Sequence, residues 1–97
     1  IILSFALLAG LLALTVTAYA QRNAITGTVT NTSRQPVADM WIELLNDVES
    51  VLKRTRTDST GRYSFQGLSF GTFQVRPVTA GTPYRSQTVR IELIPAT

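Results

Sequence analysis

The chain contains no cysteine and no histidine among its 97 residues. These absences exclude an internal disulfide, a thiol nucleophile, a zinc ribbon and an imidazole base. The net charge is only +3, and all nine Lys/Arg and all six Asp/Glu residues follow residue 20. The length suits one domain rather than two. Composition alone therefore removes cysteine- and histidine-based catalysis from consideration.

The first 20 residues differ sharply from the rest, because 16 of them are apolar and none is charged. Residues 1–14 have the length of a signal-peptide apolar region, and Ala18-Tyr19-Ala20 supplies the small residues that signal peptidase requires. We predict a hydrophobic signal helix over residues 1–20, cleaved after Ala20, and a secreted or extracytoplasmic location (periplasm or cell surface). A 20-residue apolar stretch can also span a bilayer. An uncleaved anchor, with membrane contact, is therefore the alternative.

Residues 21–97 show no 3.6-residue apolar period, and their short alternating runs are separated by Gly, Pro, Asn and Asp. Such a pattern predicts strands and turns. Six strands are expected, at residues 24–30, 40–45, 51–57, 63–65, 71–76 and 88–94. Their spacing is typical of a β-sandwich, and the connections are too short for the helical crossovers of a parallel sheet. The predicted fold class is an all-β antiparallel β-sandwich.

Alternation along each strand assigns the two faces of the sheets. In the second strand it places Met40, Ile42 and Leu44 inside, and Trp41 and Glu43 outside together with Leu45. The other inward residues are Tyr63, Phe65, Leu68, Phe73, Val75, Val89, Ile91 and Leu93, and the outward set contains Arg54, Arg56, Gln74, Arg76, Arg90 and Glu92. A domain of 77 residues (21–97) without a disulfide is near the lower size limit for a domain that folds unaided. We therefore expect modest stability, or support from a further domain or partner.

Residues 25–93 carry a series of short motifs, of which Thr57-Asp58 followed by Gly61-Arg62-Tyr63-Ser64-Phe65 is the most specific. The others are Gly27-Thr28-Val29, Pro36-Val37-Ala38 leading into Ile42-Glu43-Leu44, and the set Leu68, Gly71, Phe73 and Val75. On these residues the chain resembles the carboxypeptidase regulatory-like domain, a transthyretin-like (prealbumin-like) β-sandwich. The resemblance implies a Greek-key sandwich of about seven strands. It implies no peptidase activity, because in carboxypeptidases the zinc ligands belong to the neighbouring catalytic domain.

Trp41 is the candidate residue for surface recognition. Alternation puts it on the outer face of its strand, and an exposed tryptophan often marks recognition of sugars or protein partners. The alternative is that Trp41 covers a sheet face or docks onto a neighbouring domain. We favour this alternative, because the sequence places no second aromatic residue beside it.

The remaining charged residues predict no site. The run of Lys53, Arg54 and Arg56 is expected to be a solvated strand face, because nucleic-acid binding needs a clustered basic patch with aromatic residues. Asp58 has too few neighbouring carboxylates for calcium and is expected to form a turn. Nothing brings Glu43 and Glu92 together as an acid/base pair. We expect no catalytic residue, no cofactor and no metal.

These observations predict a signal peptide or membrane anchor at residues 1–20 and one domain at residues 21–97. The predicted function is a non-catalytic binding or structural module of a secreted or cell-envelope protein. Its expected partner is another protein or an adjacent domain, with carbohydrate as an alternative ligand and nucleic acid excluded. The alternative function is an accessory domain of a larger peptidase-like enzyme or outer-membrane receptor whose main part lies beyond Thr97.

Overall fold

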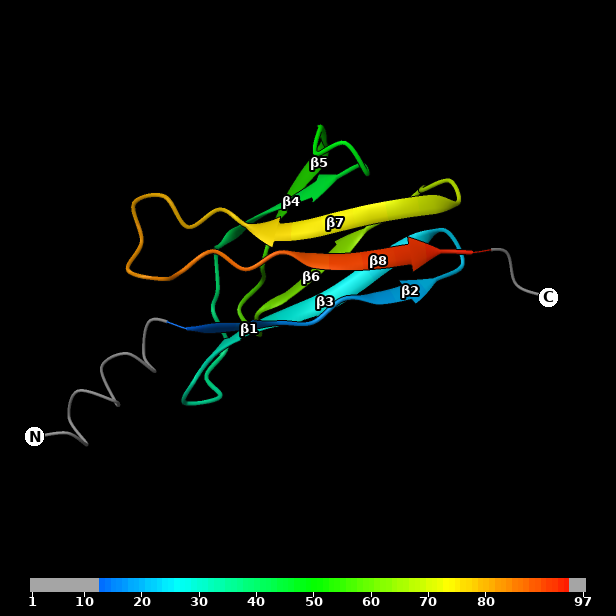
Figure 1. Cartoon of the computed structure of the whole chain (residues 1–97). Coiled ribbons are helices and arrows are strands. Elements are labelled where there is room, and N and C mark those ends of the chain that lie inside the picture. The colour runs from blue at the N-terminus through cyan, green and yellow to red at the C-terminus, as the bar shows by residue number, and fades with distance from the viewer. Residues whose placement is uncertain (1–12, 95–97) are drawn as a thin grey trace, which may run out of the picture.

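The computed structural model describes residues 13–94, whose regular structure consists of strands alone. The strands are β1 (Leu14–Val16), β2 (Tyr19–Gln21), β3 (Ala24–Asn31), β4 (Trp41–Leu45), β5 (Val51–Arg56), β6 (Arg62–Phe65), β7 (Gly71–Pro77) and β8 (Val89–Leu93) (Figure 1). Strands β3 to β8 are the six that the sequence predicts, and each boundary agrees to within one residue.

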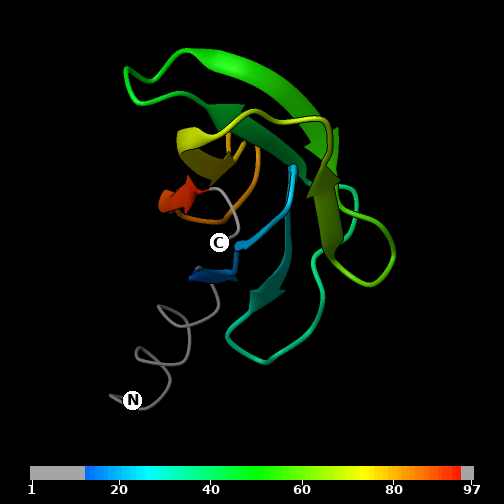
Figure 2. The same ribbon diagram turned by 90° about the vertical axis from the view of Figure 1, so that its right-hand side faces the viewer.

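These strands form two antiparallel sheets that face each other (Figure 2). In the first sheet β3 lies between β6 on one edge and β1 followed by β2 along the other. The second sheet has the order β5-β4-β7-β8. The chain crosses from one sheet to the other after β3, β5 and β6. As a result β4 and β7 are neighbours in the second sheet although they are distant in sequence. The prediction of an all-β antiparallel sandwich is confirmed.

The described part of the predicted signal helix is extended instead of helical. Residues 1–12 lie outside the described residues, whereas β1 and β2 pair with β3 in one continuous register, from Leu14 opposite Asn31 to Gln21 opposite Ala24. They amount to one strand, residues 14–21, interrupted only between β1 and β2. The local reason is the run Thr15-Val16-Thr17, since β-branched residues suit an extended backbone. Cleavage after Ala20 stays a prediction.

The core between the sheets contains the residues that alternation predicts to face inward. Leu45, predicted to face outward, is also buried, because the register of β4 with β5 shifts between Leu44 and Leu45. Ile42, Leu44 and Val75 are fully buried, and Tyr63 and Phe65 pack edge to face with ring centroids 5.9 Å apart. Met40, Leu68, Phe73 and Leu93 are buried with them, while Val89 and Ile91 are partly buried against the same cluster. Leu14 and Val16 of β1 also belong to this core. The predicted leader therefore contributes to the folded sandwich.

The two sheets also meet along both of their sides. On one side β5 contacts β6, and on the other β2 contacts β8. In Figure 1 β2 runs beside β8 as well as beside β3. Residues 14–21 therefore close one side of the sandwich. Among residues 13–94 there is no helix long and apolar enough to cross a membrane.

Candidate functional site

Trp41 lies at the start of β4 with its side chain on the outer face of the second sheet. The residue is 46% exposed, which agrees with the face that alternation predicts. Its carbonyl oxygen accepts a hydrogen bond from the backbone N–H of Val78 at 2.8 Å, so the backbone on which the indole stands is fixed. The Arg56 guanidinium lies 5.2 Å from the centre of the Trp41 ring, within the range of a cation–π interaction.

Two hollows adjoin the Trp41 side chain. One, of about 170 Å³, is lined by Trp41, Arg54 and Val78. The other, of about 350 Å³, lies between residues 37–41 and residues 78–84, and Tyr84 lines it together with Trp41. The expectation that no second aromatic residue lies near Trp41 is therefore wrong, because the loop between β7 and β8 brings Tyr84 to the same hollow. We call Trp41, Asp39, Arg54, Arg56, Val78 and Tyr84 the Trp41 surface.

Thr57 holds the segment before Trp41 in place. Its buried hydroxyl donates to the carbonyl oxygen of Val37 at 2.6 Å and accepts from the N–H of Met40 at 2.9 Å. A backbone hydrogen bond from Asp39 N–H to the Thr57 carbonyl adds a third connection. These bonds tie residues 37–40 to the end of β5, and they fix one wall of the larger hollow. The sequence gives no sign of this role, because a threonine at a strand end resembles any other threonine.

Glu43, expected on a solvated outer face, is buried in the structure with only 8% of its side chain exposed. Its Oε2 accepts from Arg54 Nε at 2.9 Å, and its Oε1 accepts from Arg76 Nε at 2.9 Å. Burial raises the pKa of this carboxyl, but the hydrogen bonds and charges of Arg76 and Arg54 outweigh that effect and hold the pKa below its usual value. Glu43 is thus an ionised structural group with both oxygens engaged.

The predicted basic run does not form a cluster. Arg54 is paired with Glu43, and Arg56 lies over Trp41 and 3.6 Å from an Asp39 carboxylate oxygen. Lys53 donates instead to the backbone carbonyl of Gln66 at 2.7 Å. The side chains of Arg54 and Arg56 are 62% and 51% exposed, which agrees with the solvated strand face expected from the sequence.

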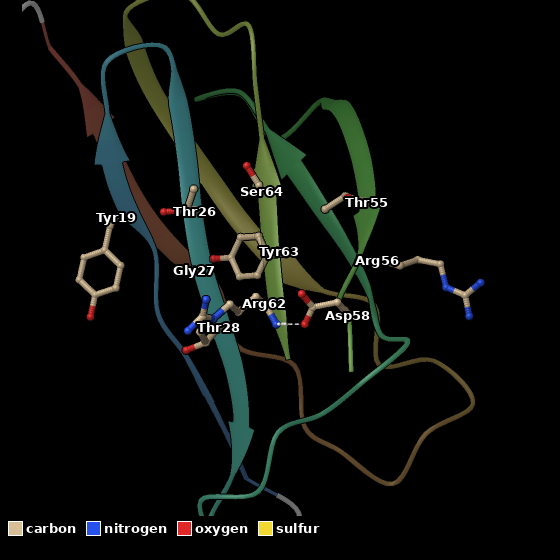
Figure 3. Close-up of a pocket in the computed structure, with 10 residues that line it drawn as sticks. All are labelled: Tyr19, Thr26, Gly27, Thr28, Thr55, Arg56, Asp58, Arg62, Tyr63 and Ser64. Atoms are coloured by element: carbon tan, nitrogen blue, oxygen red, sulfur yellow. Dashed lines mark hydrogen bonds between the residues drawn. The ribbon is translucent and has the colours of Figure 1, made fainter. Parts of the chain in front are cut away.

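A wider open groove of about 560 Å³ lies beside β3 and β6, and Figure 3 shows the residues that line it. Its one carboxylate, Asp58, belongs to the predicted turn: Oδ1 accepts from the Thr60 hydroxyl at 2.7 Å and from the N–H groups of Thr60 and Arg62. The hydrogen bond from the Thr60 hydroxyl, with the two backbone bonds, holds the pKa of Asp58 below its usual value.

The groove contains no reactive pair. The hydroxyl of Ser64 accepts a hydrogen bond from Gln66 Nε2 at 2.6 Å, and no carboxylate is hydrogen-bonded to it. A nucleophilic serine needs a neighbouring base. Residues 13–94 also contain no group of three carboxylates that could hold a metal ion.

Comparison with known proteins identifies the family. The model of the carboxypeptidase regulatory-like domain matches residues 24–96. No curated protein matches the chain. The matched region begins at the first residue of β3 and includes β4 to β8, whereas β1 and β2 precede it. The chain belongs to the carboxypeptidase regulatory-like domain family, a family of non-catalytic modules.

Proposed function

We propose that the chain is a binding module of a secreted or cell-envelope protein, and that it contacts a protein partner or an adjacent domain through the Trp41 surface. The observation that carries this proposal is the half-exposed Trp41 side chain, which lies between two hollows with Arg56 against its ring. Tryptophan, tyrosine and arginine are the residues most enriched at the energetic centres of protein interfaces. The Trp41 surface contains all three types.

The geometry favours a protein partner over a carbohydrate. A sugar ring would stack on a face of the indole, and Arg56 already covers one of the two faces of the Trp41 ring, at 5.2 Å from its centre. The hollow shared with Tyr84 is better suited to an inserted side chain, since its lining includes Val37, Met40 and Val78. Interface centres combine such an apolar depression with a charged rim. Here Asp39 and Arg56 supply the rim charges.

A photo-crosslinking amino acid at position 41 of the complete gene product, expressed in its own organism, tests the proposal. We expect one crosslinked species that mass spectrometry assigns to a single protein or to another domain of the same polypeptide. The control is the same amino acid at Val48, which is 72% exposed in the turn between β4 and β5. Equal crosslinking at both positions, or none at position 41, would contradict the proposal.

Tryptophan fluorescence gives a second readout, because Trp41 is the only tryptophan of the chain. Binding of the identified partner should shift its emission to shorter wavelength as the indole loses water. Trp41→Ala should weaken binding by about 10-fold or more, and Trp41→Phe by less. A soluble oligosaccharide that produces the same shift would favour the carbohydrate alternative.

A further inference from the structure

The edge of β3 opposite β6 carries a strand that one observation and one prediction mark as separable from the domain. Among residues 13–94 this edge is covered by residues 14–21, that is, by β1 and β2. The family match begins after them, at Ala24. The sequence also predicts that cleavage after Ala20 removes β1 and most of β2. Such cleavage would leave the N–H and C=O groups of this edge without their present partners.

The contacts of residues 14–21 define what the edge accepts. Leu14 and Val16 are 8% and 7% exposed and enter the core between the sheets. Thr17 N–H donates to the carbonyl oxygen of Thr28, and Thr28 N–H donates to the Thr17 hydroxyl, both at 3.0 Å. The edge therefore offers an apolar depression for alternate side chains, followed by backbone groups that bond a threonine.

The body of the domain is shaped to receive the backbone of such a segment. The Tyr63 hydroxyl donates a hydrogen bond to the carbonyl oxygen of Thr17. A Cβ added at Gly27 would overlap both that carbonyl oxygen and the Tyr63 hydroxyl. Gly27 and Tyr63 lie opposite each other on β3 and β6, inside the region that matches the family. The close approach thus depends on residues of the domain itself.

At β2 the space beside the β3 edge is one strand wide. On its far side β2 contacts β8, the edge strand of the second sheet. A second copy that offered its own folded β3 would bring its second sheet with it, whereas an extended segment fits between β3 and β8. Within residues 22–94 all six strands already belong to a sheet, so this part of the chain has no spare strand.

The connection between β2 and β3 does little to hold the strand in place. The pair Gln21 and Ala24 flanks a two-residue turn, Arg22-Asn23, and neither turn residue has a positive φ. Two-residue hairpin turns are favoured when they are of type I′ or II′, which require a positive φ. The edge contacts, and not the turn, keep residues 14–21 on β3.

We propose that the β3 edge is a strand-acceptor site. Residues 14–21 fill it in the precursor. After their removal it binds an extended segment of a partner protein, antiparallel to β3, with two alternate apolar side chains followed by threonine. This is binding by β-strand addition, in which main-chain bonds give affinity and the side-chain depressions give specificity. It lies on a different surface from Trp41 and extends the proposed function.

The test uses the full chain with a specific protease site inserted between Arg22 and Asn23 and with Thr30→Cys. The chain has no natural cysteine, and Thr30 lies directly opposite Thr15. After cutting, a peptide with the sequence of residues 13–21 and Thr15→Cys is added under mild oxidation. We expect a disulfide-linked complex. The matched control peptide also carries Val16→Asp. Its capture should be lower by about tenfold or more, because binding would bury the aspartate charge in the core.

Each other outcome decides the proposal. A cut chain that stays folded without capturing the peptide overturns it. If the cut chain unfolds, the peptide should restore the native Trp41 emission, and failure to do so overturns the proposal as well. A dimer formed without peptide, or an exported gene product whose β3 edge is filled by a later segment of the same polypeptide, overturns the partner protein as occupant. Trp41→Ala should leave peptide capture unchanged, so this test is independent of the Trp41 surface.

Discussion

At the residue scale, Glu43 shows how an outward-facing position can become part of the structure. Its carboxylate lies between Arg54 and Arg76, which come from β5 and β7 on either side of β4. Cross-strand pairs of opposite charge stabilise neighbouring strands. The carboxylate is buried, whereas both arginines are substantially exposed. If the carboxylate were lost, water could still solvate the two guanidinium groups, so no unpaired charge would be buried.

Glu43→Gln should therefore lower the free energy of unfolding by about 1–3 kcal/mol at pH 7. The pKa of Glu43 is lowered by folding from 4.5, so its contribution is complete above that value and is lost as the pH falls through the lower folded pKa. Denaturant titrations between pH 7 and pH 2 should show a larger loss in the natural chain than in the variant, which keeps only the contribution of other carboxylates such as Asp58. Glu92→Gln, at an exposed position of β8, is the control and should change stability by about 0.5 kcal/mol or less.

Gly27 permits the close approach of Thr17 and Tyr63, so Gly27→Ala should displace residues 14–21 from β3. We expect a loss of about 1–3 kcal/mol in unfolding free energy, as for other overpacked sites, and faster trypsin cleavage after Arg22. Tyr63→Phe keeps the ring and removes only the hydroxyl bond, so it should cost about 1 kcal/mol. Trypsin cleavage after Arg22 that is equally fast in the natural chain and in Gly27→Ala would show that Gly27 has no such role.

Among the elements, the positions of the strands could be predicted from the sequence, but the pairing between strands could not. Period-2 alternation identifies Ile42 and Leu44 as inward wherever their strand lies, and the structure agrees. The register between strands is set by the whole sandwich, so the burial of Glu43 between Arg54 and Arg76 was not predicted. The place of Tyr84 beside Trp41 depends on the path of a loop, which no alternation encodes.

The leader illustrates a different difficulty, because one segment satisfies two patterns. Its hydropathy and its Ala18-Tyr19-Ala20 motif indicate export, while Thr15-Val16-Thr17 also suits a strand. In the structure the bond predicted to be cut, between Ala20 and Gln21, lies inside the pair of β2 with β3. The predicted cleavage would therefore compete with folding for the same residues.

This competition gives a prediction for β1. Val16→Asp should release residues 14–21 from the core and increase the fraction of chain cleaved after Ala20, measured by pulse labelling and mass spectrometry in an exporting host. Thr15→Asp is the matched control, since it adds the same charge one residue away on the exposed side of the strand. If both variants are processed to the same extent, docking of β1 does not limit cleavage.

At the scale of the whole molecule, the sandwich has two sides of unequal character. One is closed by the contact of β5 with β6, which both lie inside the family match, and the other by β2, which lies outside it. No disulfide fastens either side, since the chain has no cysteine. The stability of the module therefore depends on the central strands and on whatever occupies the β3 edge.

Amide hydrogen exchange on the full chain should reveal this inequality. The central strands β4 and β7 are bonded on both edges and bury Ile42, Leu44 and Val75 completely, so their amides should exchange only through global unfolding. The amides of β2, whose three residues are all exposed, should exchange faster, through local release of residues 14–21. Urea should then reduce the difference in exchange rate between β2 and the central strands, because global unfolding becomes easier than local release. Equal protection of β2 and β4 without urea would mean that residues 14–21 are an inseparable part of the core, and the β3 edge would then not be exchangeable.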